Sequence, residues 1–295
     1  MTTAPFGRLL TAMVTPFTAD GGLDLDGAQR LASHLVDAGN DGLVISGTTG
    51  ESPTTTDAEK ERLLRAVVEA VGDRAHVVAG VGTNDTRHTV DLAREAEKAG
   101  ASGLLVVTPY YSKPPQAGLV QHFRAIADAT DLPVMLYDIP GRTGQAIATE
   151  SLIQLAQHPR IVAVKDAKDD VEATSRVLVA TDLAYYCGTD MFNLPLLALG
   201  AVGFVSVVSH VVSKQLVEMI AAYDGGDVQR ARDLHRDLMP VYTGMFRTQG
   251  AILAKAALHL LGLPAGPVRP PLIDATTAEL DVLRADLAAA GVAIQ

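Results

Sequence analysis

The stretch Arg160–Asp166, Arg-Ile-Val-Ala-Val-Lys-Asp, is an apolar, β-branched run that ends abruptly in a lysine. Such a run predicts a buried strand, Ile161–Lys165, with Lys165 at its carboxyl end. In α/β barrels the loops that follow the strands converge there and carry the chemistry. Lys165 therefore has two interpretations: a solvated residue that closes a strand, or an amine in an apolar pocket that attacks a ketone to form a Schiff base.

Seven further apolar runs alternate with longer amphipathic helical patterns, as βα units and a parallel sheet require. The eight predicted strands are Leu9–Val14, Gly42–Ser46, His76–Ala79, Gly103–Val107, Val134–Tyr137, Ile161–Lys165, Ala184–Cys187 and Gly203–Val207. Helix ends are marked by Ala38-Gly39, Ala99-Gly100 and Leu199-Gly200, and Thr56 with Glu59 predicts a capping box for a helix that runs to about Val71. Together these signals predict an α/β fold, a (β/α)8 TIM barrel.

The chain divides into two predicted regions. Residues 1–225 form the catalytic barrel, whose length is typical of this fold. Residues 226–295 show helical periodicity in three pieces, broken around Pro240, at Gly262–Pro264 and at Pro270-Pro271. We expect this second region to be a helical appendage packed on the barrel.

Composition restricts the partners. A formal net charge of -10 and the absence of a basic run argue against nucleic acid, because phosphate backbones reward clustered lysine and arginine. We expect no secretory signal and no membrane span, since the most apolar helical stretch, Ala251–Leu263, is interrupted by Lys255 and His259. Cys187 is the only cysteine, which excludes an internal disulfide and fits the cytoplasm. Because the net charge is negative, it does not attract an anionic substrate, so any carboxylate substrate must be held by donors within its binding site.

Three loops that follow predicted strands carry polar groups. Gly47–Ser52, Gly-Thr-Thr-Gly-Glu-Ser, offers hydroxyl and backbone N–H groups that can hold a carboxylate, or is an ordinary strand-to-helix loop. Thr108–Pro115 places Tyr110 beside Tyr111, and adjacent tyrosines more often pack than react. Tyr137–Gly144 contains Pro-Gly-Arg, and Tyr137 ends its strand as Lys165 ends the next, so both should face one rim.

In this order and at this spacing, from Thr11 to about Ser209, these motifs resemble the dihydrodipicolinate synthase / N-acetylneuraminate lyase family of class I pyruvate aldolases. The resemblance implies condensation of pyruvate with L-aspartate 4-semialdehyde, through a lysine Schiff base and enamine, to 4-hydroxy-tetrahydrodipicolinate. This is the first committed step of diaminopimelate and lysine biosynthesis. It also implies a lyase that needs no metal and no cofactor, and a homotetramer built as a dimer of dimers.

The resemblance also assigns roles to residues of this chain. The implied catalytic residues are Lys165, Tyr137, Thr49 and Tyr111, of which the last three form a proton relay. The implied substrate-binding residues are Thr48, Thr49, Arg142, Gly188 and Val205. Tyr111 would come from a neighbouring subunit, Arg142 would bind the carboxylate of the semialdehyde, and Gly188 and the Val205 carbonyl would line the lysine pocket.

One departure from the family pattern concerns regulation. Lysine-inhibited members carry histidines in the helix where this chain has Asp57 and Lys60, and a glutamate where it has His88. Asn84 and Tyr110 of that effector site are retained. We predict weak or absent inhibition by lysine, because a cationic Lys60 repels a cationic effector. Asp138, where many members have asparagine, is a milder departure.

Four alternatives have distinguishing features. The nearest alternative is another pyruvate aldolase, which cleaves N-acetylneuraminate or a 2-keto-3-deoxy sugar acid; the N-acetylneuraminate lyases tend to have serine at position 48 and to lack the arginine found here at position 142. A metal-dependent aldolase would need clustered histidines, but only His210 lies near a predicted rim. A phosphate-binding barrel would need glycine-rich loops after the seventh and eighth strands, which this chain lacks. A catalytically silent paralogue would have no chemical need for the lysine, the tyrosines and the arginine together.

Overall fold

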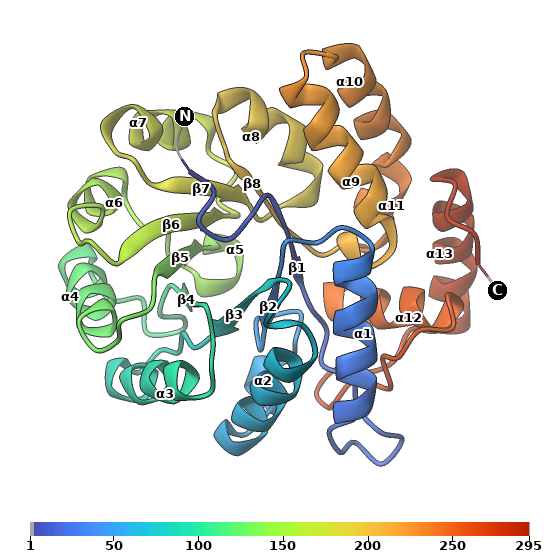
Figure 1. Ribbon diagram of the computed structural model, residues 1–295, viewed down its shortest axis with the longest axis horizontal. Coiled ribbons are helices and arrows are strands. Elements are labelled where there is room, and N and C mark those ends of the chain that lie inside the picture. The colour runs from blue at the N-terminus through green and yellow to red at the C-terminus, as the bar shows by residue number, and fades with distance from the viewer. Residues whose placement is uncertain (1–2, 295) are drawn as a thin grey trace.

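The computed structural model describes residues 3–294 and contains eight parallel strands that close into a barrel, as Figure 1 shows. The strands are β1 (Leu9–Ala12), β2 (Gly42–Ile45), β3 (His76–Gly80), β4 (Gly103–Val107), β5 (Val134–Asp138), β6 (Ile161–Asp166), β7 (Ala184–Cys187) and β8 (Gly203–Ser206). They pair in sequence order, and β1 pairs with β8 to close the ring. All eight predicted strands are confirmed, each to within two residues at its carboxyl end.

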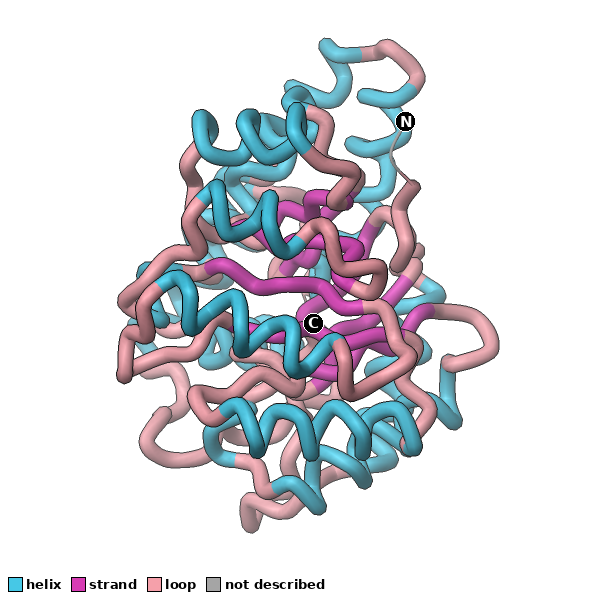
Figure 2. Tube along the Cα trace, turned by 90° about the vertical axis from the view of Figure 1, so that its left-hand side faces the viewer, coloured by secondary structure: helices cyan, strands magenta, loops and turns pink. Residues whose placement is uncertain are grey.

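Helices follow the strands and surround the barrel, so that strands lie at the centre of the molecule and helices outside (Figure 2). Two 3-10 turns, η1 (Ser52–Thr54) and η2 (Asp190–Phe192), follow β2 and β7. The helices of this layer are α1 (Leu25–Asp37), α2 (Asp57–Val71), α3 (Thr86–Lys98), α4 (Gln116–Ala127), α5 (Pro140–Thr143), α6 (Thr149–Leu155), α7 (Val171–Ala180), α8 (Asn193–Leu199) and α9 (Ser209–Asp224).

The ends of these helices follow from the sequence. The Thr56 hydroxyl accepts from the Glu59 backbone N–H, and the Glu59 carboxylate accepts from the Thr56 N–H, so the predicted capping box is present. Helices α1, α3 and α8 end within two residues of the glycines that predicted their ends. Local signals therefore set the boundaries, while the continuous apolar strands supply the buried core.

The C-terminal region adds α10 (Val228–Asp237), α11 (Met239–Gly244), α12 (Gly250–Leu260) and α13 (Thr277–Ala289). The predicted number of three helical pieces is wrong, since the described residues form four. Pro240 lies in the first turn of α11, where its missing N–H leaves no intrahelical bond unmade, so it begins a helix. Between α12 and α13, residues 261–276 form an irregular segment that we call the C-terminal strap.

The position of the C-terminal region is fixed by packing against the barrel layer. Helix α10 packs on α9, and α13 packs on α11 and α12 (Figure 1). None of the helices in residues 3–294 combines the length and apolar character needed to cross a bilayer. The strap returns to the carboxyl ends of β1 and β2, where the predicted site lies.

Candidate active site

Lys165 and Tyr137 are neighbours across β5 and β6. The two residues are register partners in the parallel pair, and because strand side chains alternate between faces, partners share a face. Both are buried, and the Lys165 Nζ lies 4.2 Å from the centroid of the Tyr137 ring. Lys165 makes no ion pair with any of residues 3–294. The structure thus places a buried amine beside a phenol.

Gly188 lies against the lysine. A β-carbon at this position would lie 2.9 Å from the Lys165 Cε, closer than such atoms approach, and 3.0 Å from the Asp166 carbonyl oxygen, a tight contact. The Gly188 N–H donates to that same carbonyl at 2.7 Å, which fixes the approach. A larger residue at this position would therefore displace the Lys165 side chain or the backbone beside it. Val205 is fully buried in β8, which β7 separates from β6.

The loop after β2 is folded tightly. The Glu51 N–H donates to the Thr48 carbonyl at 3.2 Å, and the Thr15 hydroxyl donates to the Gly50 carbonyl at 2.6 Å. Glu51 has a φ of 55°, a left-handed conformation that is strained for a residue with a side chain. The loop holds Thr49 buried and Thr48 half-buried. Their hydroxyl and backbone groups are the donors that a carboxylate would need.

A cavity of about 390 Å³ opens at the carboxyl ends of the strands. Three predicted site residues line it: Thr48, Tyr137 and Arg142. Arg142 lies on α5 with an exposed side chain, so its guanidinium stands at the mouth. The rest of the lining includes the apolar Val81, Leu105 and Val107 and the polar group Asp57, Lys60, Asn84, His88 and Tyr110. An apolar cavity with a few placed polar groups is typical of a small-molecule site.

Tyr111 does not face the cavity of its own chain. Its side chain is 90% exposed and is not among the residues that line the cavity, and its backbone has a φ of 72°. Within residues 3–294, no hydrogen bond joins the hydroxyls of Tyr137 and Thr49. A single chain therefore brings together the lysine, Tyr137 and the threonine loop, but does not assemble the predicted relay of three hydroxyls.

Two buried carboxylates, Asp138 and Asp166, lie on the outward faces of the same strand ends. The sequence predicted no partner for either of them. Asp138 and Asp166 are register partners one residue beyond Tyr137 and Lys165. Asp138 Oδ2 lies 3.4 Å from the Lys168 Nζ, and Asp138 Oδ1 accepts from the Ile147 N–H. Burial raises the pKa of Asp138 to about 6, and the Lys168 ammonium opposes this rise. The sequence signal that could have indicated the Asp138–Lys168 pair is Lys168 itself, a second lysine three positions after Lys165.

No group of three or more histidine, cysteine, aspartate or glutamate side chains that could hold a metal ion occurs within residues 3–294. His210 is buried with its Nε2 accepting from the Val14 N–H and its Nδ1 bonded to the Val207 carbonyl, so both ring nitrogens are used. Its role is to join β1 to the start of α9.

Comparison with known proteins agrees with this geometry. The sequence profile of the Dihydrodipicolinate synthetase family matches residues 5–290. The chain is 74% identical over 288 residues to the 4-hydroxy-tetrahydrodipicolinate synthase of Acidothermus cellulolyticus, covering 98% of this chain and 94% of that protein. It is 68% identical to 4-hydroxy-tetrahydrodipicolinate synthase 2 of Streptomyces coelicolor, covering 98% and 96%.

Solved structures give the same result. The crystal structure of DHDPS from Cyanidioschyzon merolae with lysine bound superposes with a TM-score of 0.97 at 44% identity, covering 99% of this chain and 100% of that one. Sequence and fold are therefore shared along nearly the whole length, including every strand end described above. The chain belongs to the dihydrodipicolinate synthetase family.

Proposed function

We propose that the protein is a 4-hydroxy-tetrahydrodipicolinate synthase, a lyase that condenses pyruvate with L-aspartate 4-semialdehyde in diaminopimelate and lysine biosynthesis. The observation that carries the proposal is the buried Lys165 amine, 4.2 Å from the Tyr137 ring, beside a cavity lined by Thr48 and Arg142. The 74% identical relative bears the same name. The reaction occurs in the cytoplasm and uses neither a metal nor an organic cofactor.

The first half-reaction forms the nucleophile. The neutral Lys165 amine attacks the pyruvate ketone and, with loss of water, gives an imine. The imine withdraws electrons from the adjacent methyl group, which loses a proton and becomes the carbon of an enamine. Thr48 and Thr49 hold the pyruvate carboxylate through hydroxyl and backbone N–H groups. Tyr137 lies next to the amine, where its hydroxyl can transfer these protons.

The second half-reaction joins the substrates. The enamine carbon attacks the aldehyde carbon of the semialdehyde, forming the new carbon–carbon bond and regenerating the imine. The semialdehyde's own amine then attacks the imine carbon, closes the ring and releases Lys165. Arg142 at the cavity mouth binds the semialdehyde carboxylate, because a guanidinium presents paired N–H donors to two oxygens.

The relay is completed between subunits. A phenol alone is a poor acid or base near neutral pH, so proton transfer needs a chain of hydroxyls that reaches solvent. Tyr111 projects from its own chain with 90% of its side chain exposed, which supports its insertion into the site of a partner subunit. The active unit is then a dimer that contributes two sites, within a homotetramer of two such dimers.

The nearest alternative is another class I pyruvate aldolase that cleaves N-acetylneuraminate or a 2-keto-3-deoxy sugar acid. It would use the same lysine and the same barrel. Arg142 and Thr48 on one cavity favour a charged acceptor with a carboxylate near its aldehyde. A sugar acceptor instead would need several hydrogen-bonding partners for its hydroxyls.

The test measures pyruvate consumption by the purified protein with aspartate semialdehyde, beside a parallel reaction that offers N-acetylmannosamine. We expect consumption with the semialdehyde alone. Borohydride reduction in the presence of pyruvate should also attach one pyruvate-derived group per subunit, detected by mass spectrometry at Lys165.

Two variants serve as controls for this test. Lys165→Ala should lose both turnover and the trapped adduct, while Lys98→Ala, an exposed lysine at the end of α3, should keep both. Consumption with the sugar alone would retain the Schiff-base barrel and reject the substrate. Absence of the adduct from the unmodified protein would reject the proposed function altogether.

A further inference from the structure

A lysine of the C-terminal region is buried against the loop that carries Thr48 and Thr49. Lys255, on α12, has a side chain that is 2% exposed, and its Nζ lies 2.6 Å from a carboxylate oxygen of Glu51, whose side chain is 1% exposed. The same Nζ donates to the Pro267 carbonyl of the C-terminal strap at 2.7 Å. Burial lowers the pKa of Lys255, and the Glu51 carboxylate opposes this effect.

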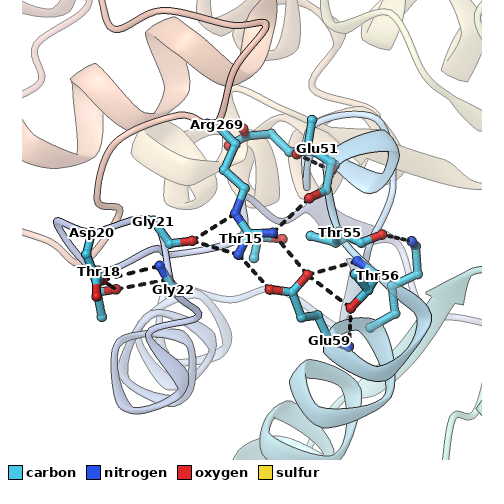
Figure 3. Close-up of polar contacts among 12 residues, drawn as sticks. Thr15, Thr18, Asp20, Gly21, Gly22, Glu51, Thr55, Thr56, Glu59 and Arg269 are labelled. Atoms are coloured by element: carbon cyan, nitrogen blue, oxygen red, sulfur yellow. Dashed lines mark hydrogen bonds and ion pairs between the residues drawn. The ribbon is translucent and has the colours of Figure 1, made fainter.

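The strap adds a second anchor to the same loop. The Arg269 backbone N–H donates to the other Glu51 oxygen at 2.8 Å, so each oxygen of this carboxylate is held by the C-terminal region. The Arg269 guanidinium donates to the Thr54 and Gly21 carbonyls and pairs with both Glu59 oxygens. Figure 3 shows Arg269 reaching between the loop that contains Gly21 and the start of α2.

The cationic groups of Lys255 and Arg269 both contact one aromatic ring, that of Phe17. Phe17 follows β1, and its ring centroid lies 4.1 Å from the Lys255 Nζ and 4.2 Å from the Arg269 Cζ. The Phe17 N–H donates to the Ala265 carbonyl of the strap at 3.2 Å. The strap, the loop after β1 and the loop after β2 therefore form one packed unit at the rim of the barrel.

A buried ion pair is a weak source of stability, because desolvating both charges offsets much of their attraction. What such a pair does supply is geometry. Glu51 is a non-glycine residue held at positive φ, two positions after Thr49, and its N–H is bonded to the Thr48 carbonyl. A displacement of the Glu51 side chain would release this turn and move both threonines.

We propose that Lys255 and Arg269 are positioning residues of the pyruvate site. Lys255 and the Arg269 N–H act through Glu51, and the Arg269 guanidinium acts through Thr54 and Glu59, to hold Thr48 and Thr49 in the conformation that binds the pyruvate carboxylate. The C-terminal region thereby completes the active site of the barrel without touching the substrate. The proposal rests on the proposed function in one respect, that these threonines bind pyruvate.

The experiment compares the enzyme with the double variant Glu51→Gln/Lys255→Met. The two replacements keep the side-chain volumes and remove both charges together, so no lone buried charge remains to unfold the protein. A positioning role predicts a rise of roughly tenfold or more in KM for pyruvate and slower borohydride trapping, since small displacements of binding groups have large kinetic effects. The KM for the semialdehyde should change much less.

A second variant and a control separate positioning from general stability. Arg269→Met removes the guanidinium contacts, leaves the Lys255–Glu51 pair, and should raise the pyruvate KM several-fold. Arg247→Met removes an ion pair with Asp286 that joins the end of α11 to α13, away from the loop. It should lower the thermal midpoint and leave the pyruvate KM unchanged.

The outcomes are distinct. The positioning role is supported if the pyruvate KM rises in the double variant or in Arg269→Met while the pyruvate KM of Arg247→Met stays the same. This holds even if all the variants have the same thermal midpoint. A pyruvate KM equal to that of the unmodified enzyme in both loop-facing variants overturns it. An unmodified enzyme that traps no pyruvate would instead overturn the proposed function, so the two failures are not confused.

Discussion

Gly188 lies so close to the Lys165 side chain that the lysine pocket has no room for a β-carbon there. In Gly188→Ala, either the lysine or the end of β6 must move, because the added methyl would lie 2.9 Å from Cε and 3.0 Å from a backbone oxygen. We expect kcat to fall about 100-fold, since a displacement near 1 Å has effects of this size. Steady-state kinetics and the rate of pyruvate trapping measure it.

Gly118→Ala is the matched control for that substitution. Gly118 lies on α4, and an added methyl would meet its nearest atom at 3.5 Å, an ordinary contact. This variant should keep full turnover. Unchanged kcat in Gly188→Ala would show that the lysine does not depend on the close approach.

Asp138 gives a prediction for pH dependence. Its pKa is about 6 in the folded protein, above its ordinary value near 3.8, because it is buried. Between pH 4 and 6 the Asp138 carboxyl is ionised in the unfolded chain but still protonated in the folded protein. The stability that this protonated carboxyl contributes at low pH is therefore lost as pH rises through 6. Above that pH the contribution no longer changes. The loss amounts to roughly 2 to 3 kcal/mol.

The variant Asp138→Asn removes the titrating group and retains an acceptor for the Ile147 N–H. The thermal midpoint of the unmodified protein, relative to that of the variant, should therefore fall from pH 4 to about pH 7 and level off above it. A difference that is independent of pH over this range would mean that the folded Asp138 titrates as an ordinary carboxyl.

The outer part of the cavity bears on regulation by lysine. His88 Nε2 lies 2.9 Å from an Asp57 carboxylate oxygen, so that carboxylate already has a partner, and Lys60 offers only N–H donors. We expect little inhibition by millimolar lysine, although a bound lysine is part of the related Cyanidioschyzon merolae structure. A lysine titration of initial rates tests this, and inhibition at low millimolar concentration would contradict it.

At the scale of the elements, local sequence signals were sufficient for the barrel. The β-branched run Ile161–Val164 predicted a strand that the structure contains, and the Thr56–Glu59 capping box marked the start of α2. Tyr137 and Lys165 could be placed together because both end strands of one parallel sheet. Side-chain pairs between segments that are not strands of the barrel could not be predicted, because no local pattern specifies them.

Lys255 is the clearest example of that limit. The sequence showed it only as a charge that interrupts the apolar stretch of α12, whereas the structure shows it buried on Glu51. A charge within an otherwise apolar helix signals a buried partner but does not identify it. In the same way, the exposure of Tyr111 and the Asp138–Lys168 pair depend on loop conformations that no periodicity encodes.

The C-terminal strap gives a prediction at this scale. Gly266 has a φ of 66°, and an added β-carbon would lie 1.7 Å from the Phe17 carbonyl oxygen. Gly266→Ala must therefore lift the strap from the barrel, at a cost of roughly 2 to 5 kcal/mol. Gly291→Ala, at a φ of 72° with no atom within 4 Å, should cost only about 1 to 2 kcal/mol.

Thermal midpoints of the two alanine variants, measured under one set of conditions, make the comparison. We also expect Gly266→Ala alone to raise the pyruvate KM, because the strap carries Arg269. Equal midpoints for the two variants would show that the strap can leave Phe17 at no cost.

At the scale of the whole molecule, the exposed Tyr111 predicts that two inactive variants regain activity when their subunits form a mixed dimer. In a dimer of a Tyr111→Phe subunit with a Lys165→Ala subunit, one of the two sites regains both groups. Half of randomly formed dimers are such hybrids, so a mixture refolded in equal amounts should show about a quarter of the unmodified activity. Each variant refolded alone provides the baseline.

Activity of the mixture no greater than the average of its parents would contradict a shared site. It would mean that Tyr111 acts within its own chain, or has no part in the proton transfers. Size-exclusion chromatography of the same samples shows whether hybrid oligomers formed.

The anchor between the strap and the loop after β2 also sets an order of events during biosynthesis. Glu51 and Arg269 are separated by 218 residues, and at about 5 to 20 residues per second a ribosome needs roughly 10 to 45 s to cover that distance. During the later part of this interval the chain already contains Lys165 but has no anchored threonine loop. Ribosome-bound chains should therefore trap pyruvate more slowly until the strap has emerged, and borohydride trapping during pulse-labelled translation can time this change.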